Sequence, residues 1–413
     1  MARMLPRRPH ADPTLLVPLL LGIVVLVDLA VARGVLLSPD STRYLQGAQA
    51  LIDGRGLSRE QLPYAGYIGL VAGLQRLGLG IDGIIAFQYA CVLVAIAAVW
   101  SAAGRIAGRR AALLAALLVA LSPDLTRFIG WPTFLLTDVP YMSSVAVVMA
   151  LTLRAAAGGR ADLGWLLVAS SGVVLLRPTG WLLVATCWSW LAYVRRPAPI
   201  GRLSAAVPWL VCLAIPIATG IAGGDTFARP VDQLQQGTVV FDSTMWRPTM
   251  PKEPGLGAGY GGALQYALRH PIATADLMAR RIAAEALHVR TVNSAAHNLV
   301  AGGYSVVLLL GAAIALVKFW RRPEPWLAAV LVALHLLVVG IHWADYDGRF
   351  FVQIVPALAV LAGVGWTSWS LPSRLSRGPS PGGLDRALPG HQRRERPDVG
   401  RGRALAPVEN DHP

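Results

Sequence analysis

Charged residues are scarce in this chain. They make up 15% of its 413 residues, whereas 54% are hydrophobic and the mean hydropathy is +0.52. A soluble domain carries about 25% charged residues. Because apolar runs recur along most of the chain, the composition argues against a soluble protein and predicts one that spans a membrane.

Lysine is almost absent as well. Lys252 and Lys318 are the only two, so arginine supplies nearly all of the formal net charge of +14. The arginines cluster at the ends of apolar runs and in the C-terminal tail. That placement fits the positive-inside rule of membrane proteins better than a nucleic-acid surface, so no nucleic-acid partner is predicted.

Cysteine and the common soluble motifs give no site. The three cysteines, Cys91, Cys187 and Cys212, all fall inside apolar runs, with no CxxC pair and no Cys/His metal spacing. A disulfide framework or a structural zinc site is therefore not predicted. The sequence also lacks a Walker loop, a GxGxxG motif after a strand and an HExxH motif, so nothing predicts nucleotide chemistry.

Ten apolar runs are each predicted to form a membrane-spanning helix, which gives an all-α integral membrane fold. The third, fifth and sixth runs are shorter than the roughly 20 residues that a full crossing needs, so they either extend into polar flanks or dip and return. The runs cover approximately residues 15–37, 81–104, 111–123, 135–153, 163–176, 179–194, 203–222, 299–319, 326–343 and 349–370.

The first run has two interpretations. Arg3, Arg7 and Arg8 precede it and Ala30-Val31-Ala32 resembles a cleavage site, as in a signal peptide. The run is nevertheless long enough to span the membrane, which favours an uncleaved first helix.

Loop charge predicts the topology. The short loops after the second, fourth, sixth and eighth runs are rich in arginine and lysine, so this face is predicted to be cytoplasmic. The protein is then a multi-pass protein of the cell membrane with both termini in the cytoplasm. Two long loops, at about 38–80 and 223–298, are predicted on the outer face. The first is expected to contain helices that lie along the membrane interface.

The chain is predicted to form one membrane domain over residues 1–370. Residues 371–413 are dominated by proline, glycine, serine and arginine and show no apolar period. They are predicted to form a disordered basic tail in the cytoplasm, where anionic membrane lipid is its expected partner.

Four polar places lie on the predicted outer face, and the first is Asp40 in "SPDSTRYLQGAQAL". One interpretation makes Asp40 the N-cap of an interfacial helix. The other makes it a general base that accepts a proton from an acceptor hydroxyl at the membrane surface. Arg43 and Tyr44 follow at three and four residues, within reach of Asp40 on the first helical turn.

The second place is the loop "SPDLTRFIGWPTFLLTDVPY", with Asp124 near its start, Asp138 near its end and Arg127 between them. The two acids can cap the ends of two helices. They can also join Asp40 in one polar site, because the loop is predicted on the same face.

The third place is Arg177 in "VLLRPTGWLL", between two apolar runs. An arginine at membrane depth is costly, so it should face protein, water or an anion. A lipid phosphate matches the guanidinium group in charge and geometry. Snorkelling of the side chain at a tight helix turn is the simpler alternative.

The fourth place is "GIHWADYDGRFF", between the ninth and tenth runs. His342, Tyr346 and Arg349 lie there with two aspartates. Such a density of polar side chains in a short link favours a site over a solvated loop.

In this order, the four places resemble those of the GT-C class of integral-membrane glycosyltransferases. The similarity is greatest to bacterial members related to protein O-mannosyltransferases and to the aminoarabinose transferases of lipid A. It covers roughly residues 15–370 and rests on the stretches "SPDSTRYLQGAQAL", "LPYAGYIGL", "LLTDVP", "LLRPTG" and "GRFFVQIVPALAVLAG". None of the stretches is specific alone, and their order and common face carry the resemblance.

The resemblance implies an activity. Enzymes of this class take a sugar from a polyprenyl-phosphate donor at the outer membrane face and invert the anomeric configuration. By that match, Asp40 is the catalytic base and Asp138 orients the base or the acceptor. Arg177 and Arg349, with Arg127 behind them, would bind the donor phosphate. The remaining polar side chains, Arg43, Tyr44, Asp124, His342 and Tyr346, are predicted to line the acceptor side of the site.

Two departures from the class limit the prediction. Many relatives carry a paired Asp-Glu in the first loop, whereas Ser41 follows Asp40 here, so no metal ion is predicted and the cofactor is left open. The second long loop is also short beside relatives that have an extra soluble domain, which leaves the acceptor unknown.

A transporter is the alternative from another functional class. A flippase for a lipid-linked sugar would also need many helices and charges within the membrane. It should, however, show repeat symmetry and polar residues near the bilayer midplane. Here most acids and arginines gather at one face, which favours an enzyme. A polymerase or ligase of the cell envelope shares the donor class and stays open.

Overall fold

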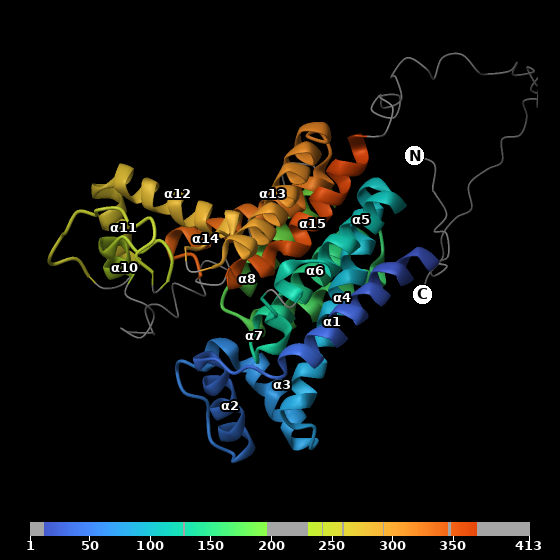
Figure 1. The fold of residues 1–413 in the computed structure, drawn as a ribbon, viewed down its shortest axis with the longest axis horizontal. Helices are drawn as coiled ribbons and strands as arrows, with labels where there is room; N and C mark the ends of the chain where they lie inside the picture. Colours follow the sequence, from blue (N-terminus) through green and yellow to red (C-terminus); the bar gives the residue numbers. More distant parts are fainter. Residues whose placement is uncertain are drawn as a thin grey trace, which may run out of the picture. The chain divides into compact units, whose positions relative to one another are not determined.

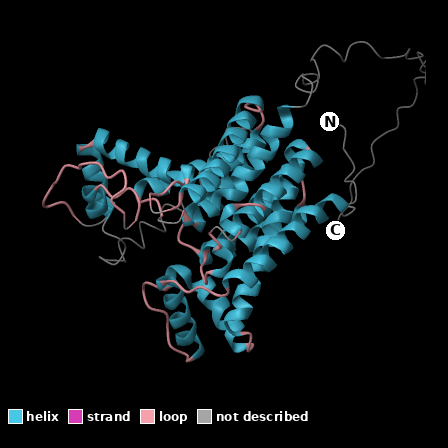
Figure 2. Ribbon diagram, viewed as in Figure 1, coloured by secondary structure: helices cyan, strands magenta, loops and turns pink. Residues whose placement is uncertain are grey.

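The computed structural model describes residues 12–126, 129–195, 230–241, 243–257, 260–291, 293–345 and 348–369. Over these residues the regular structure is helical, with two isolated β-bridges between extended segments (Figure 2). The predicted all-α fold is thus confirmed.

Among the described residues, six helices are long and apolar enough to cross a membrane, as expected of a multi-pass membrane protein. Helices α5, α7 and α8 are shorter. The six long helices and these three shorter ones are α1 (Leu16–Arg33), α4 (Gly80–Ala107), α5 (Arg109–Ala120), α6 (Asp138–Ala156), α7 (Arg160–Leu176), α8 (Gly180–Arg195), α13 (Ala295–Lys318), α14 (Pro323–Ile341) and α15 (Arg349–Trp369). They coincide with nine of the ten predicted runs, whereas the run at 203–222 lies outside the described residues. The number of crossings therefore stays a prediction.

Helix α15 packs against α4, α5, α6, α13 and α14, whereas α1 lies at the edge of the bundle (Figure 1). In the most apolar window of α15, 83% of the residues are buried, against 22% for α1. Small residues let α15 approach its neighbours closely: Gly363 faces the backbone of α5, and Gly365 faces the backbone of α13. Such small-residue contacts are typical of helix packing in membranes.

The first long loop forms two helices, α2 (Pro39–Ile52) and α3 (Ala65–Arg76), which pack together (Figure 1). Gly66 at the start of α3 meets the end of α7, where an added Cβ would lie 2.9 Å from the carbonyl oxygen of Leu175. Glycine at this position therefore lets α3 approach the segment that contains Arg177.

The described part of the second long loop forms a small lobe, residues 230–291. It contains α10 (Pro230–Gln236), α11 (Tyr260–Arg269) and α12 (Pro271–Leu287) (Figure 1). The lobe has a core of its own, to which Val339, Ala344 and Phe350 also belong or pack. It is thereby attached to the link between α14 and α15.

Candidate functional site

The starts of α2 and α6 are held side by side by a β-bridge. Leu36 and Phe134 form this parallel bridge, in which the Leu36 amide donates to Thr133 at 3.0 Å. Asp40 and Asp138 each follow their bridge residue by four positions. Because the bridge is parallel, it brings the two acids to neighbouring helix starts.

Ser38, not Asp40, is the N-cap of α2. Its hydroxyl accepts from the Ser41 amide, and the Ser41 hydroxyl accepts from the Ser38 amide, which completes a capping box. The Ser41 hydroxyl also donates to the Leu135 carbonyl at 2.8 Å, a second link between the two helix starts. The capping interpretation of Asp40 is therefore wrong, and its carboxylate serves other contacts.

A buried glutamine fixes the segment that leads to Asp138. The Gln88 side chain, on α4, donates to the carbonyls of Pro132 and Phe134 and accepts from the Leu136 amide. It also accepts from the Tyr67 hydroxyl at 3.0 Å. Every polar atom of this side chain is thus used to hold the backbone just before α6.

Arg349 joins the two acids. Its Nη1 donates to Oδ2 of Asp40 at 2.7 Å, and its Nε donates to Oδ2 of Asp138 at 2.6 Å. Arg43 pairs with Asp40 from the next helical turn, with 3.3 Å between Nη2 and Oδ1. Asp40, Asp138 and Arg349, which come from three helices, therefore form one ion cluster.

The second carboxylate oxygen of Asp138 is occupied as well. Arg177 donates to Oδ1, and Gln353 donates to the same oxygen at 2.7 Å. Burial opposes the charge of Arg177, but the nearby Asp138 carboxylate outweighs it and raises the pKa of the guanidinium above its ordinary value. Asp138 thus anchors two arginines and a glutamine.

The two acids differ in access. The Asp138 side chain is 1% exposed, whereas that of Asp40 is 25% exposed. A molecule entering the site can therefore reach Asp40, while the arginine groups shield Asp138. Of the two predicted catalytic acids, only Asp40 has the access that contact with a substrate requires.

Three helix N-termini meet at the cluster. Asp40 is in the first turn of α2, and Asp138 and Arg349 are the first residues of α6 and α15. The positive end of the helix dipole stabilises a carboxylate or another anion placed there. Three helix ends, the buried guanidinium group of Arg177 and the partly buried one of Arg349 together make a place suited to an anion.

Tyr44 contributes a buried hydroxyl beside this place. The residue is fully buried against Tyr64 and Tyr67, with ring centroids 5.4 and 5.1 Å away. Its hydroxyl has no hydrogen-bond partner among the described residues. Burial first, then the charges of Tyr64 and Asp40, raise the pKa of Tyr44, so it is a neutral donor.

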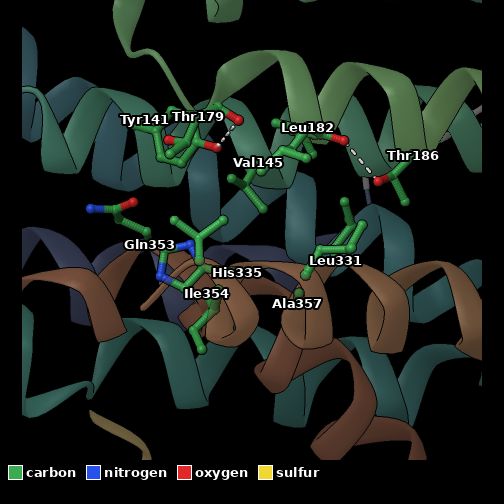
Figure 3. A pocket seen from close by; sticks show the side chains of 13 residues that line it. Tyr141, Val145, Thr179, Leu182, Thr186, Leu331, His335, Gln353, Ile354 and Ala357 are labelled. Carbon is green, nitrogen blue, oxygen red and sulfur yellow. Dashed lines mark hydrogen bonds between the residues drawn. The ribbon is translucent and has the colours of Figure 1, made fainter. Parts of the chain in front are cut away.

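A small, partly open hollow lined mainly by apolar side chains adjoins the cluster between α6, α8, α14 and α15 (Figure 3). Gln353 lines it and also donates to Asp138, so the hollow and the ion cluster share a wall. His335 and Thr179 line it too, and their Nε2 and Oγ1 atoms have no hydrogen-bond partner among the described residues. The combination suits a molecule with a hydrocarbon part and a charged end.

Other predicted site residues lie elsewhere. Asp124 is buried, accepts from the Ser122 hydroxyl at 3.0 Å and lies 3.9 Å from Nδ1 of His288. The ring of His342 packs at 5.9 Å from that of Trp343. The described contacts of Asp124 and His342 are therefore with residues outside the ion cluster of Asp40, Asp138 and Arg349.

Two further predicted site residues, Arg127 and Tyr346, lie outside the described residues.

Gln88 and Gln353 were missed by the sequence interpretation. Gln353 follows Arg349 by four residues on α15 and so shares its helix face. That spacing could have revealed it. Gln88 has no such signal, because its role depends on a backbone segment that comes from elsewhere in the sequence.

Comparisons with known proteins give remote structural likenesses alone. No family model and no curated protein sequence matches the chain. The archaeal oligosaccharyltransferase AglB from Archaeoglobus fulgidus, in complex with an inhibitory peptide and a dolichol-phosphate, is similar with 12% identity and a TM-score of 0.46. That likeness covers 84% of this chain and 50% of AglB.

ArnT from Cupriavidus metallidurans is similar in two states. Bound to undecaprenyl phosphate, it has 18% identity and a TM-score of 0.47, with 88% of this chain and 60% of ArnT covered. In the apo state it has 15% identity and a TM-score of 0.34, with 86% of this chain and 78% of ArnT covered. The chain thus spans about half the length of AglB and three fifths of the length of ArnT in its lipid-bound form.

Proposed function

We propose that this protein is a glycosyltransferase that moves a sugar from a polyprenyl-phosphate donor to an acceptor hydroxyl. The bridge that Arg349 makes between Asp40 and Asp138 carries the proposal. It places an accessible carboxylate beside two guanidinium groups, as transfer away from a phosphate leaving group requires. The resemblance of the motifs to the GT-C class supports the same reaction.

The donor phosphate binds Arg177 and Arg349. Asp138 accepts from Nη1 of Arg177 and from Nε of Arg349, and Asp40 accepts from Nη1 of Arg349. These bonds orient both guanidinium groups and leave Nη2 of each to an anion. Guanidinium pairs with phosphate through two parallel hydrogen bonds. The Tyr44 hydroxyl donates from the side. The first isoprene unit of the lipid packs against the apolar side chains that line the hollow beside Gln353.

Asp40 acts as the base. It takes the proton of the acceptor hydroxyl, whose oxygen attacks the anomeric carbon as the bond from that carbon to the phosphate oxygen breaks. The electron pair goes to the phosphate, which leaves as polyprenyl monophosphate. Because attack and departure are in line on opposite sides of the carbon, the configuration inverts. Arg177 and Arg349 stabilise the negative charge that develops on the leaving group.

Donor binding also prepares the base. Arg349 is paired with Asp40 at 2.7 Å. A phosphate competes with Asp40 for this guanidinium and so releases one carboxylate oxygen. The base then becomes available when a donor is present, which protects the acceptor site from unproductive proton transfer.

The outer membrane face is the proposed location. The 19-residue helix α6 begins at Asp138. Arg154, in its last turn, lies about 24 Å further along the helix and pairs with Asp162 of α7. Arg109 and Lys318 mark helix ends of the same kind. Since positive residues gather on the cytoplasmic side, the ion cluster faces outward. Both termini are then cytoplasmic.

Transfer from a panel of radiolabelled polyprenyl-phosphate sugars tests the proposal. The purified protein in liposomes is given membrane extract as the acceptor source, with heat-inactivated protein as the control. Label that moves from the lipid to an acceptor supports the enzyme. A protein that transfers no sugar from any donor, but moves the lipid across the bilayer, would be a transporter instead.

A further inference from the structure

Arg349 is preceded by a link whose backbone is held by the small lobe. The link runs from His342 to Gly348, and its described part pairs with the lobe at Ala344. Ala344 donates to the Val239 carbonyl and accepts from the Phe241 amide, both at 2.9 Å. The lobe therefore reaches the residues that immediately precede the ion cluster.

Both the backbone amide and the backbone carbonyl of Asp345 are hydrogen-bonded by side chains of the lobe. Its amide donates to Oε2 of Glu285 at 3.1 Å. Its carbonyl accepts from Arg290 twice, from Nε at 3.2 Å and from Nη2 at 2.8 Å. Glu285 is 0% and Arg290 1% exposed, and the two side chains lie 3.6 Å apart. Two buried side chains thus define where Asp345 lies.

Asp345 in turn holds the start of α15. Its Oδ2 accepts from the Arg349 amide at 3.3 Å. His288 confines the same turn, since a Cβ added to Gly348 would lie 1.9 Å from the imidazole Nε2. Gly348 also has φ +70°, which a glycine tolerates best. The backbone from which the Arg349 side chain extends is therefore fixed by the lobe.

We propose that Glu285 and Arg290 are positioning residues, which hold Asp345 and so set Arg349 between Asp40 and Asp138. Neither side chain touches the ion cluster in the contacts described. Glu285 and Arg290 act on the ion cluster through the peptide group of Asp345 and the start of α15. The inference rests on the function proposed above for Arg349 and adds that the second long loop controls its placement.

The lobe offers a matched control in Arg281. This residue is also on α12 and fully buried, and it donates to the carbonyls of Gln233, Thr238, Gly340 and Ile341. It has no described bond to Asp345. Replacing Arg281 by lysine removes hydrogen bonds of the same lobe but leaves the described bonds to Asp345 in place.

Hydrogen exchange and sugar transfer together test the proposal. Glu285→Ala removes the acceptor for the Asp345 amide, whereas Glu285→Gln keeps an oxygen there. We expect faster exchange at the amides of residues 348–353 in the alanine variant, and wild-type exchange in the glutamine and Arg281→Lys variants. Transfer should fall by about tenfold to a hundredfold in the alanine variant alone, since small misplacements of a catalytic group cost that much.

The outcomes separate this inference from the proposed function. Unchanged exchange at 348–353 in Glu285→Ala overturns the positioning role, as does a loss of transfer no larger than that of Arg281→Lys. If the wild type transfers no sugar, the proposed function fails and the exchange result alone decides the positioning role. Should Glu285→Ala fail to fold, Arg290→Lys provides the same test, because lysine cannot donate the two bonds to the Asp345 carbonyl.

Discussion

Arg349 makes contacts that another cation cannot reproduce. Two of its nitrogens bond carboxylates from different helices, at 2.6 and 2.7 Å. A planar guanidinium presents several donors in fixed directions, whereas a lysine ammonium is a single point charge on a flexible stem. The residue type, and not the charge alone, therefore keeps Asp40 and Asp138 in one cluster.

The substitution Arg349→Lys should lower the rate of sugar transfer by about a hundredfold, because it removes a donor to the developing phosphate charge. Affinity for polyprenyl monophosphate should fall in parallel in a binding assay. Arg43→Lys is the control: Arg43 also pairs with Asp40 but is 38% exposed, and exposed pairs contribute little. Equal losses in the two variants would argue against a special role for Arg349.

At the scale of elements, small residues determine how α15 fits between its neighbours. A Cβ at Gly365 would lie 1.9 Å from the Gly311 carbonyl oxygen, so the backbones of α13 and α15 touch at this point. Gly303, also on α13, has no heavy atom within 4 Å of such a Cβ. The packing requirement is thus local to the contact face and is not a property of glycine in these helices.

Gly365→Ala should destabilise the protein by about 1–3 kcal/mol through overpacking and lower its thermal midpoint in detergent. Gly303→Ala should leave the midpoint unchanged or raise it slightly, because alanine favours the helix. Thermal unfolding of the two variants beside the wild type measures the difference. Equal midpoints would mean that α13 and α15 are not in backbone contact.

The buried acid of α12 makes stability depend on pH. Burial raises the pKa of Glu285 to about 8, although the charge of Arg290 opposes the rise. A raised pKa in the folded state means that the folded protein binds the proton more tightly than the unfolded chain. The stability that this group contributes is therefore complete below about pH 4.5, the ordinary value, and is lost as the pH rises through about 8.

Glu285→Gln should flatten the fall of the thermal midpoint between pH 4.5 and 8. Part of the slope will remain, because burial also raises the pKa of Asp124 and acts in the same direction. Midpoints measured across this range in wild type and variant provide the test. A wild-type midpoint that rises with pH over the same range, with an identical slope in the variant, would contradict the assignment.

At the scale of the whole molecule, periodicity and charge predicted the helices well and their contacts poorly. Apolar runs located α4, α13, α14 and α15 to within a few residues, because a membrane helix is a local property of the sequence. The meeting of Asp40 with Asp138 depends on the bridge from Leu36 to Phe134, which no local pattern announces.

In the loop before α6, two acids that are close in the sequence have different partners in the structure. Asp124 and Asp138 lie in one loop of the sequence, yet Asp124 packs near His288 of the small lobe while Asp138 joins the arginines. Shared membership of a loop therefore did not predict a shared site. Tertiary contacts of each loop end, which the sequence does not display, decide where its side chains go.

The proposed topology makes a labelling prediction. In a variant without the three native cysteines, Gly56→Cys should react with a membrane-impermeant maleimide in intact cells. Arg110→Cys should react only after permeabilisation. Both positions are exposed, and they lie on the first long loop and at a basic helix end respectively. The reverse pattern would place the ion cluster on the cytoplasmic side.

The most direct measurement compares wild type with Asp40→Asn for transfer and for donor binding. Asparagine keeps the size of the side chain but cannot accept the acceptor proton. We predict that the variant binds a polyprenyl-phosphate sugar through Arg177 and Arg349 at least as tightly as the wild type, because the Asp40 charge no longer competes for Arg349. It should nevertheless transfer the sugar at least a hundredfold more slowly, roughly the effect of removing a general base. Transfer at the wild-type rate, with donor binding intact, would show that Asp40 is not the base.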